Sequence, residues 1–300
     1  MTPTHFWRAV NTLHAVVYFA PDAKSRYEAL GLKGYWMGYF ASRGAALGTP
    51  SAEVVTATFH GFSPAMVARA IPDAWSMAER EAVLAERAAI AADALRPGLQ
   101  GYDVAALTTR LAGAADGLDV AGKPLAAAQR ALPAPTHAPH GGGAGPWAAE
   151  SAGGGAPDAG ATDECAVFWH HLTVLREFRG DCHIAVLLAA GLGGAAANVL
   201  QVAVGKAPEN QRQLRGWTEQ EWAAAEDDVR QRGWIDDDGV VTESGRLARE
   251  RIEDATDRAC EAFMDRESRA HAVAVSDELR DAAGSVGPVT FPNATGNGRP

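Results

Sequence analysis

The chain has little of what marks secreted, membrane or zinc-binding proteins. Its 300 residues include only three cysteines, Cys165, Cys182 and Cys260, and none of them belongs to a CxxC pair. Three thiols cannot all pair within one chain, so we expect reduced cysteines, a cytoplasmic location and no metal site. No uninterrupted apolar run reaches the roughly 18 residues of a membrane span, and the N-terminus has no small-residue cleavage site. The sequence therefore predicts neither membrane insertion nor secretion.

Positive charge is also scarce. Lysine and arginine number 27 against 37 aspartates and glutamates, which gives a formal net charge of -10. A nucleic acid could be bound only through a local basic face acting against this overall field. The composition is 47% hydrophobic and 21% charged, which excludes a fully disordered chain and a collagen-like fibre. We expect a globular protein.

The chain has no long stretch in which apolar and polar residues alternate with period two, the pattern of a strand. Stretches rich in Ala, Glu, Leu and Arg favour helix. We predict a mainly α fold with two helical blocks, the second of which ends in a winged helix with a small β-hairpin. The predicted parts are an aromatic-rich helical domain over residues 1–132, a disordered Gly/Pro/Ala linker over 133–162, a helical bundle with the winged helix over 163–283, and a disordered tail over 284–300.

Local signals in the second block predict how its helices begin and end. Residues 164–190 predict one or two helices interrupted near 179–181, with Asp181 as the cap of the second helix. Thr218 followed by Glu221 forms a capping box for a helix that Gly233 closes. Residues 234–235 and 240–241 then predict two short strands around a tight turn, before Thr242 caps a last long helix.

Residues 231–253, QRGWIDDDGVVTESGRLARERIE, resemble the wing and following helix of MarR-type winged-helix regulators. More of the chain resembles a bacterial helix-turn-helix family without an assigned role. The stretches that carry this second resemblance are HAVVYFAP at 14–21, GYWMGYF at 34–40 with Arg43, TATF at 56–59, IPDAW at 71–75, LR at 175–176 and RGD at 179–181. Membership of such a family implies a fold more than a function.

The charge of the expected winged helix argues against DNA as its main partner. Residues 206–260 hold nine basic side chains and fourteen carboxylates, and the expected wing carries Asp236, Asp237 and Asp238. Phosphate neutralisation supplies most non-specific DNA affinity, so an acidic wing is poorly suited to it. A winged helix used for packing or dimerisation is the competing interpretation, with weak DNA contact left open.

Aromatic side chains concentrate in the N-terminal half, among small residues and beside arginine and histidine. They either fill a core or form the walls of a flat apolar pocket, in which an arginine would hold a carboxylate. Histidines and an arginine of the second block are further candidates. The candidate ligand-binding residues are His14, Tyr18, Tyr35, Trp36, Tyr39, Arg43, Phe59, His60, His171, Arg179 and His183.

The leading functional hypothesis is a ligand-sensing, regulator-like homodimer that binds a small apolar or aromatic molecule in its first half. The alternative is an enzyme or a haem- or cofactor-binding protein of specialised metabolism, in which the winged helix is only a scaffold. A third interpretation is an obligate dimer that serves another protein. No acid/base pair or nucleophile has a spacing that compels a mechanism, and no cofactor follows from the sequence.

Overall fold

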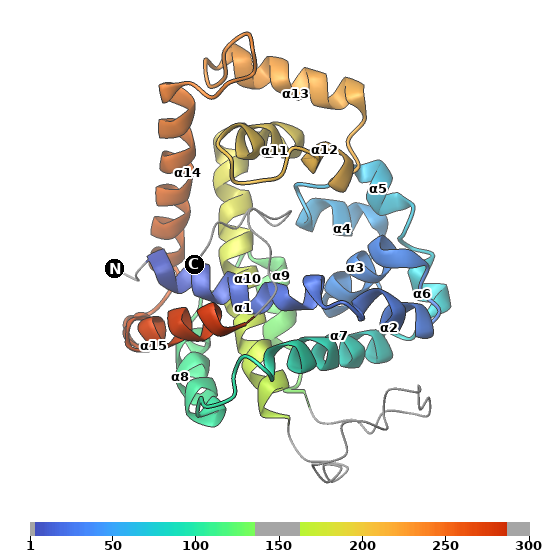
Figure 1. The fold of residues 1–300 in the computed structure, drawn as a ribbon, viewed down its shortest axis with the longest axis vertical. Helices are drawn as coiled ribbons and strands as arrows, with labels where there is room; N and C mark the ends of the chain where they lie inside the picture. The colour runs from blue at the N-terminus through green and yellow to red at the C-terminus, as the bar shows by residue number, and fades with distance from the viewer. Residues whose placement is uncertain (1–3, 136–162, 287–300) are drawn as a thin grey trace.

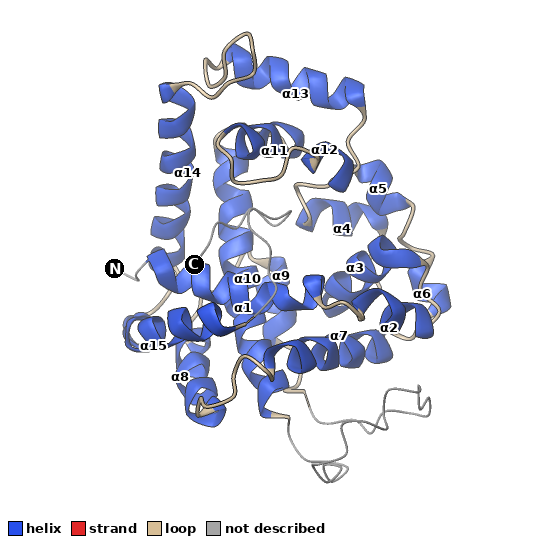
Figure 2. Ribbon diagram, viewed as in Figure 1, coloured by secondary structure: helices blue, strands red, loops and turns tan. Residues whose placement is uncertain are grey.

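The computed structural model describes residues 4–135 and 163–286, and these residues are helical with short connections (Figures 1 and 2). The predicted mainly α fold is confirmed. The predicted linker lies outside the described residues except at 133–135, and the predicted tail lies outside them beyond residue 286.

The helices before the undescribed interior segment are mostly short. They are α1 (Thr4–Phe19), α2 (Ala23–Ala29), α3 (Gly34–Gly44), the 3-10 turn η1 (Ala45–Leu47), α4 (Ala52–Thr58), α5 (Pro64–Ala68), α6 (Ala74–Met77), α7 (Arg80–Leu95), α8 (Val104–Asp116) and α9 (Pro124–Arg130). The helices after it are α10 (Glu164–Ala189), α11 (Gly194–Ala203), α12 (Gln211–Leu214), α13 (Glu219–Gln231), α14 (Glu243–Ala262) and α15 (Arg266–Ser285).

The main hydrophobic core is built from both predicted blocks. Helix α10 packs against α1, α7, α8, α9 and α14, and α15 packs against α1 and α8. Phe6, Phe40, Leu111, Phe178 and Leu279 are all fully buried in this one cluster. In Figure 1 the long α10 runs from the lower part of the molecule, where α7 lies, to α11 at its upper end. Burial of this apolar surface is the main force that holds the two halves together.

Helix α10 is continuous across residues 179–181, so the predicted interruption there is wrong. Asp181 therefore caps no second segment of this helix. Its carboxylate instead accepts a hydrogen bond from the backbone N–H of Ala126, at 3.0 Å, in the first turn of α9. Helix N-termini leave such N–H groups without a partner inside the helix, and a carboxylate from a neighbouring helix can satisfy them. The cap is tertiary rather than local.

A second, smaller core lies where α10 ends, among α11, α13 and α14. Leu187, Leu200, Val229, Ile235 and Ile252 are its buried members. The predicted capping box is confirmed, because the side chain of Thr218 accepts from the Glu221 N–H and that of Glu221 accepts from the Thr218 N–H. We call this unit, from α11 to the start of α14, the helix-turn module.

The predicted β-hairpin of the winged helix is wrong. Among the described residues no strand forms, and Ile235 and Val241 make one isolated antiparallel bridge. The carboxylate of Asp236 accepts hydrogen bonds from the N–H groups of Asp238 and Val240 and so closes a tight turn. Val240 is 58% exposed. Residues 240–241, the predicted second strand, therefore bury too little surface to stabilise further strand pairing.

No described helix is by itself long and apolar enough to cross a membrane. Helices α10 and α11 together reach that length and hydropathy, across a bend of 100°.

Candidate functional site

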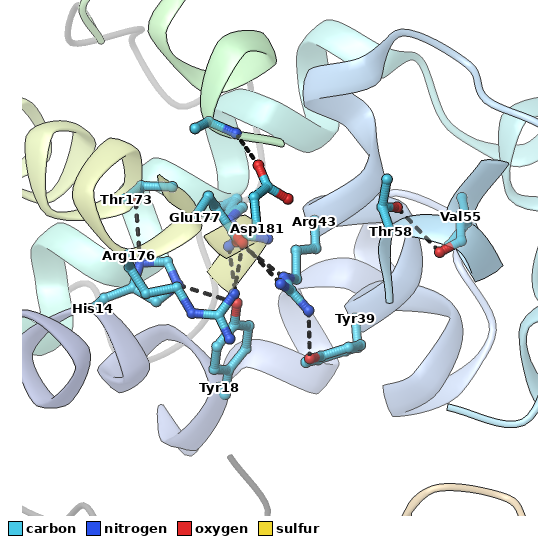
Figure 3. Close-up of polar contacts among 12 residues, drawn as sticks. His14, Tyr18, Tyr39, Arg43, Val55, Thr58, Thr173, Arg176, Glu177 and Asp181 are labelled. Carbon is cyan, nitrogen blue, oxygen red and sulfur yellow. Dashed lines mark hydrogen bonds and ion pairs between the residues drawn. The ribbon is translucent and has the colours of Figure 1, made fainter. Parts of the chain in front are cut away.

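A buried ion pair joins the two halves of the molecule. Arg43 of α3 donates to Glu177 of α10 through two nitrogens, Nε to Oε1 at 3.0 Å and Nη2 to Oε2 at 2.8 Å (Figure 3). Arg176 adds a third bond to the same carboxylate at 2.6 Å. Glu177 is fully buried and Arg43 is 6% exposed. Paired, hydrogen-bonded charges of this kind persist in an apolar interior, whereas isolated ones do not.

The surroundings keep this ion pair charged. Burial alone would raise the pKa of Glu177, but the guanidinium groups of Arg176 and Arg43 outweigh it and hold that pKa well below its usual range. Tyr39 accepts from Arg43 at 3.3 Å, and the face of the Phe59 ring lies 4.3 Å from the Arg43 guanidinium. Arg43 is therefore held on several sides by protein groups.

His14 lies next to this pair and is a packed, neutral residue. Its ring contacts the hydroxyls of Thr173 at 3.2 Å and Tyr18 at 3.1 Å, and it stacks on Trp169 with ring centroids 5.3 Å apart. Burial, followed by the charges of Arg176 and Arg87, lowers the pKa of His14 well below 6.5. It has no free ring nitrogen for a proton transfer.

Arg87 of α7 differs from Arg43, although both are buried. Its side chain is 2% exposed and donates to the Tyr18 hydroxyl at 3.1 Å. The guanidinium carbon lies 5.2 Å from the Trp169 ring centroid. Its Nε and Nη1 atoms are buried without a hydrogen-bond partner, and in the described part of the chain no carboxylate pairs with it.

A pocket of about 600 Å³ opens beside Arg87. Helix α7 forms one wall, and α9 with the residues after it and the start of α10 form the others. Trp169, Leu84, Ala88 and Leu132 give it an apolar lining, and Gln129 adds a polar group whose Nε2 is also buried without a partner. This combination of apolar walls and a few polar groups is typical of small-molecule sites.

The charged rim of the pocket is internally paired. Glu86 and Asp93 both bind Arg26, and Asp163 binds Arg96 at 2.9 Å. Arg80 pairs with Glu81 at 2.9 Å. Two arginines line the pocket, Arg80 and Arg87. Unlike Arg80, Arg87 has no carboxylate within ion-pair distance among residues 4–135 and 163–286.

Several predicted site residues do come together, around Glu177 rather than around the pocket. Arg43 binds Glu177 directly, Tyr39 and Phe59 contact Arg43, and His14 with its partner Tyr18 lies beside the pair (Figure 3). Tyr35 and Trp36 extend the group, with ring centroids 6.3 and 5.6 Å from that of Tyr39. None of these seven residues lines the pocket described here. Their role in ligand binding stays a prediction.

The other four predicted residues lie elsewhere. Arg179 binds Glu253 and Asp257 of α14 at 2.7 and 2.9 Å, and His183 contacts Thr256 of the same helix at 2.9 Å. His60 contacts the carbonyl of Leu192 at 3.1 Å, and His171 packs edge-on against the ring of His170. Arg179 and His183 thus tie α10 to α14, and His60 ties the first half to the loop between α10 and α11. No cluster of three or more metal-ligating side chains occurs in the ranges that the structure describes.

Sequence reasoning missed Arg87, Gln129 and Glu177. A signal for Arg87 exists, because it occupies the apolar face of α7, four residues after Val83 and eight before Leu95, which are both fully buried. A charged residue at such a position must find a partner or a ligand. Gln129 and Glu177 carry no comparable local signal.

Comparison with known proteins gives one family and no individual relative. No curated protein and no solved structure matches the chain significantly. A family model described as a helix-turn-helix family matches residues 3–288, nearly the whole chain. The protein belongs to this helix-turn-helix family.

Proposed function

We propose that the protein is a small-molecule-binding, regulator-like protein whose pocket beside Arg87 holds an apolar or aromatic ligand. The observation that carries this proposal is the pocket itself. Its volume of about 600 Å³ falls in the range of sites that enclose drug-sized ligands. The indole of Trp169 and the side chains of Leu84 and Leu132 supply the apolar contact surface.

Helix α10 supports a link from this pocket to the helix-turn module. It carries Trp169 at the pocket, Glu177 in the buried ion pair and Leu187 in the second core. A helix of 26 residues spans about 39 Å at 1.5 Å per residue. A ligand that binds one position of α10 better than another would shift the position of the helix-turn module.

The surface of the helix-turn module favours a protein partner over DNA. Helix α13 exposes the carboxylates of Glu219, Glu221 and Asp227, which would face DNA phosphates with like charge. Val240 and Leu247, on the turn and on α14, are exposed apolar side chains. We therefore propose self-association through this module, with DNA contact weak.

Two alanine-to-tryptophan variants test the pocket. Ala85 is exposed on α7 and lines the pocket, so Ala85→Trp should fill it without disturbing the core. Ala105→Trp, at an exposed position of α8 outside the pocket, is the matched control. We expect native mass spectrometry and a thermal-shift screen to find a small molecule that binds the parent chain and Ala105→Trp but not Ala85→Trp.

Equal binding by both tryptophan variants would exclude the pocket as the site. Sedimentation velocity and fluorescence anisotropy with a duplex library, each with and without the ligand, test the helix-turn module. We expect the ligand to change the association state, and sequence-selective DNA binding without such a change would overturn the proposed partner.

A further inference from the structure

The charge balance around the pocket leaves one positive charge without a counter-ion. Glu177 already receives Arg43 and Arg176, and the carboxylates at the rim are bound by Arg26 and Arg96. Arg87 is 2% exposed, and among the described residues its partners are the Tyr18 hydroxyl and two aromatic rings. A guanidinium stays charged at any physiological pH, so this site has an unmatched positive charge.

Hydrogen bonding shows the same deficit. Arg87 Nε and Nη1 and Gln129 Nε2 are all donors, all are buried, and none has an acceptor among the described residues. Both side chains line the same pocket, from α7 and α9. Buried donors are nearly always satisfied in native proteins. Cation–π contacts with Trp169 and Tyr18 attract the guanidinium charge but supply no hydrogen-bond acceptor for Nε or Nη1.

We infer that the pocket binds a small organic monocarboxylate, whose carboxylate accepts hydrogen bonds from Arg87 and Gln129 and whose apolar body lies against Trp169, Leu84 and Leu132. A single unmatched guanidinium fits a single negative charge. The paired carboxylates of Glu86, Asp93 and Asp163 at the rim disfavour a dianion such as a phosphate ester. This inference rests on one part of the proposed function, namely that the pocket beside Arg87 is the ligand site.

Matched acid and amide probes test the inference. Benzoate, 2-naphthoate and octanoate are compared by calorimetry with their carboxamides, which keep the shape and lack the charge. We expect at least one carboxylate to bind about tenfold or more tightly than its amide, because hydrogen bonds to a charged group are stronger than neutral ones. Arg87→Gln should remove this preference, so that the acid and its amide bind with about equal affinity.

The matched control is Arg80→Gln. Arg80 also lines the pocket, but it is paired with Glu81 and bonds the Ala45 carbonyl, so its loss should change carboxylate affinity by less than about twofold. Circular dichroism of each variant establishes that it is folded. A second variant, Arg87→Lys, keeps the charge and should retain part of the preference.

The outcomes separate the two proposals. Equal affinity for acid and amide, both abolished by Ala85→Trp, would overturn the monocarboxylate inference and leave the pocket as a ligand site. Tighter binding of phenyl phosphate than of benzoate would overturn the class of anion. Absence of binding by all three carboxylates would overturn the inference, and a failure of every screened compound to discriminate Ala85→Trp from Ala105→Trp would overturn the proposed function as well.

Discussion

At the scale of single residues, buried charges determine which substitutions the chain tolerates. Glu177 is the one carboxylate that two guanidinium groups share in the interface between α3 and α10. Such a pair adds little net stability when it is intact, because desolvation offsets most of the attraction. Removal of one partner is different, since it leaves a buried charge without compensation.

Glu177→Gln should therefore destabilise the protein strongly. The variant keeps the volume of the side chain but leaves Arg43 buried without a counter-ion, at a cost of about 3–5 kcal/mol in the free energy of unfolding. Chemical denaturation followed by circular dichroism measures the loss. Glu250→Gln, at an exposed position of α14, is the control and should change stability by less than about 0.5 kcal/mol. If Glu177→Gln lowers the free energy of unfolding by less than about 1 kcal/mol, the buried ion pair is contradicted.

Asp181 should make stability fall as the pH rises. Burial raises its pKa to about 6, although the Ala126 N–H donates to it. Because the folded pKa lies above the unfolded one, the folded state binds this proton more tightly, and its contribution is present below pH 4 and lost as the pH rises through about 6. The loss is up to about 3 kcal/mol.

Asp181→Asn keeps an acceptor for the Ala126 N–H and cannot ionise. Its stability relative to the parent chain should increase between pH 4.5 and 7.5, as measured by denaturation midpoints at both values, since only the parent has to bury an ionised carboxylate at this site. A constant difference between the two proteins across that range would show that Asp181 is already ionised in the fold at low pH.

At the scale of elements, the turn before α14 depends on one close approach. A Cβ atom on Gly245 would lie 2.1 Å from the carbonyl oxygen of Trp234. Thr242 closes the same turn, because its hydroxyl donates to the Gly233 carbonyl at 2.6 Å and accepts from the Gly245 N–H at 3.1 Å. A glycine three residues after Thr242, within the stretch that carried the MarR-type resemblance, thus has a steric explanation without a β-hairpin.

Gly245→Ala should loosen this turn. Because the Cβ meets backbone rather than a flexible side chain, we expect a loss of about 1–3 kcal/mol. Faster amide hydrogen exchange at residues 233–242 should accompany it. Gly284→Ala in α15, where a Cβ meets nothing within 4 Å, is the control and should raise stability by up to about 1 kcal/mol. Unchanged exchange in Gly245→Ala would contradict the close approach.

At the scale of the whole molecule, the main core belongs to neither predicted block alone. Buried residues of α1, α7 and α8 share one cluster with Phe168 and Phe178 of α10 and with Leu279 of α15. A fragment that lacks α10 and α15 would expose this apolar surface to water. Its folding would then lose a large part of its hydrophobic stabilisation.

Residues 1–135 expressed alone should therefore fail to fold cooperatively. Co-expression with residues 163–300 should give a 1:1 complex, because the shared core can form between two chains. Size-exclusion chromatography with light scattering and thermal melts by circular dichroism measure both results. A cooperative melt of the first fragment alone would show that it has an independent core.

The local parts of the fold could be predicted from the sequence. The capping box at Thr218, the end of α13 before Gly233 and the cap at Thr242 follow from neighbours within four positions along the chain. The hairpin after Gly233 and the interruption of α10 could not be predicted correctly. The hairpin failed because Val240 is left exposed by the fold, so the segment after the Asp236 turn has little surface to bury. The interruption failed because the partner of Asp181 is the N-terminus of α9, which is distant in the sequence.

The candidate site was predictable only in part. Aromatic and arginine content pointed to residues that do assemble around Glu177, but the pocket formed next to them, beside Arg87 and Gln129. The amino-acid sequence by itself determined the helical character of the chain, its net negative charge and the helix ends at Thr218, Gly233 and Thr242, since composition and short-range hydrogen bonds control these. The tertiary structure decided which charges are buried and which of them lack a partner, because burial and pairing depend on side chains brought together from distant helices.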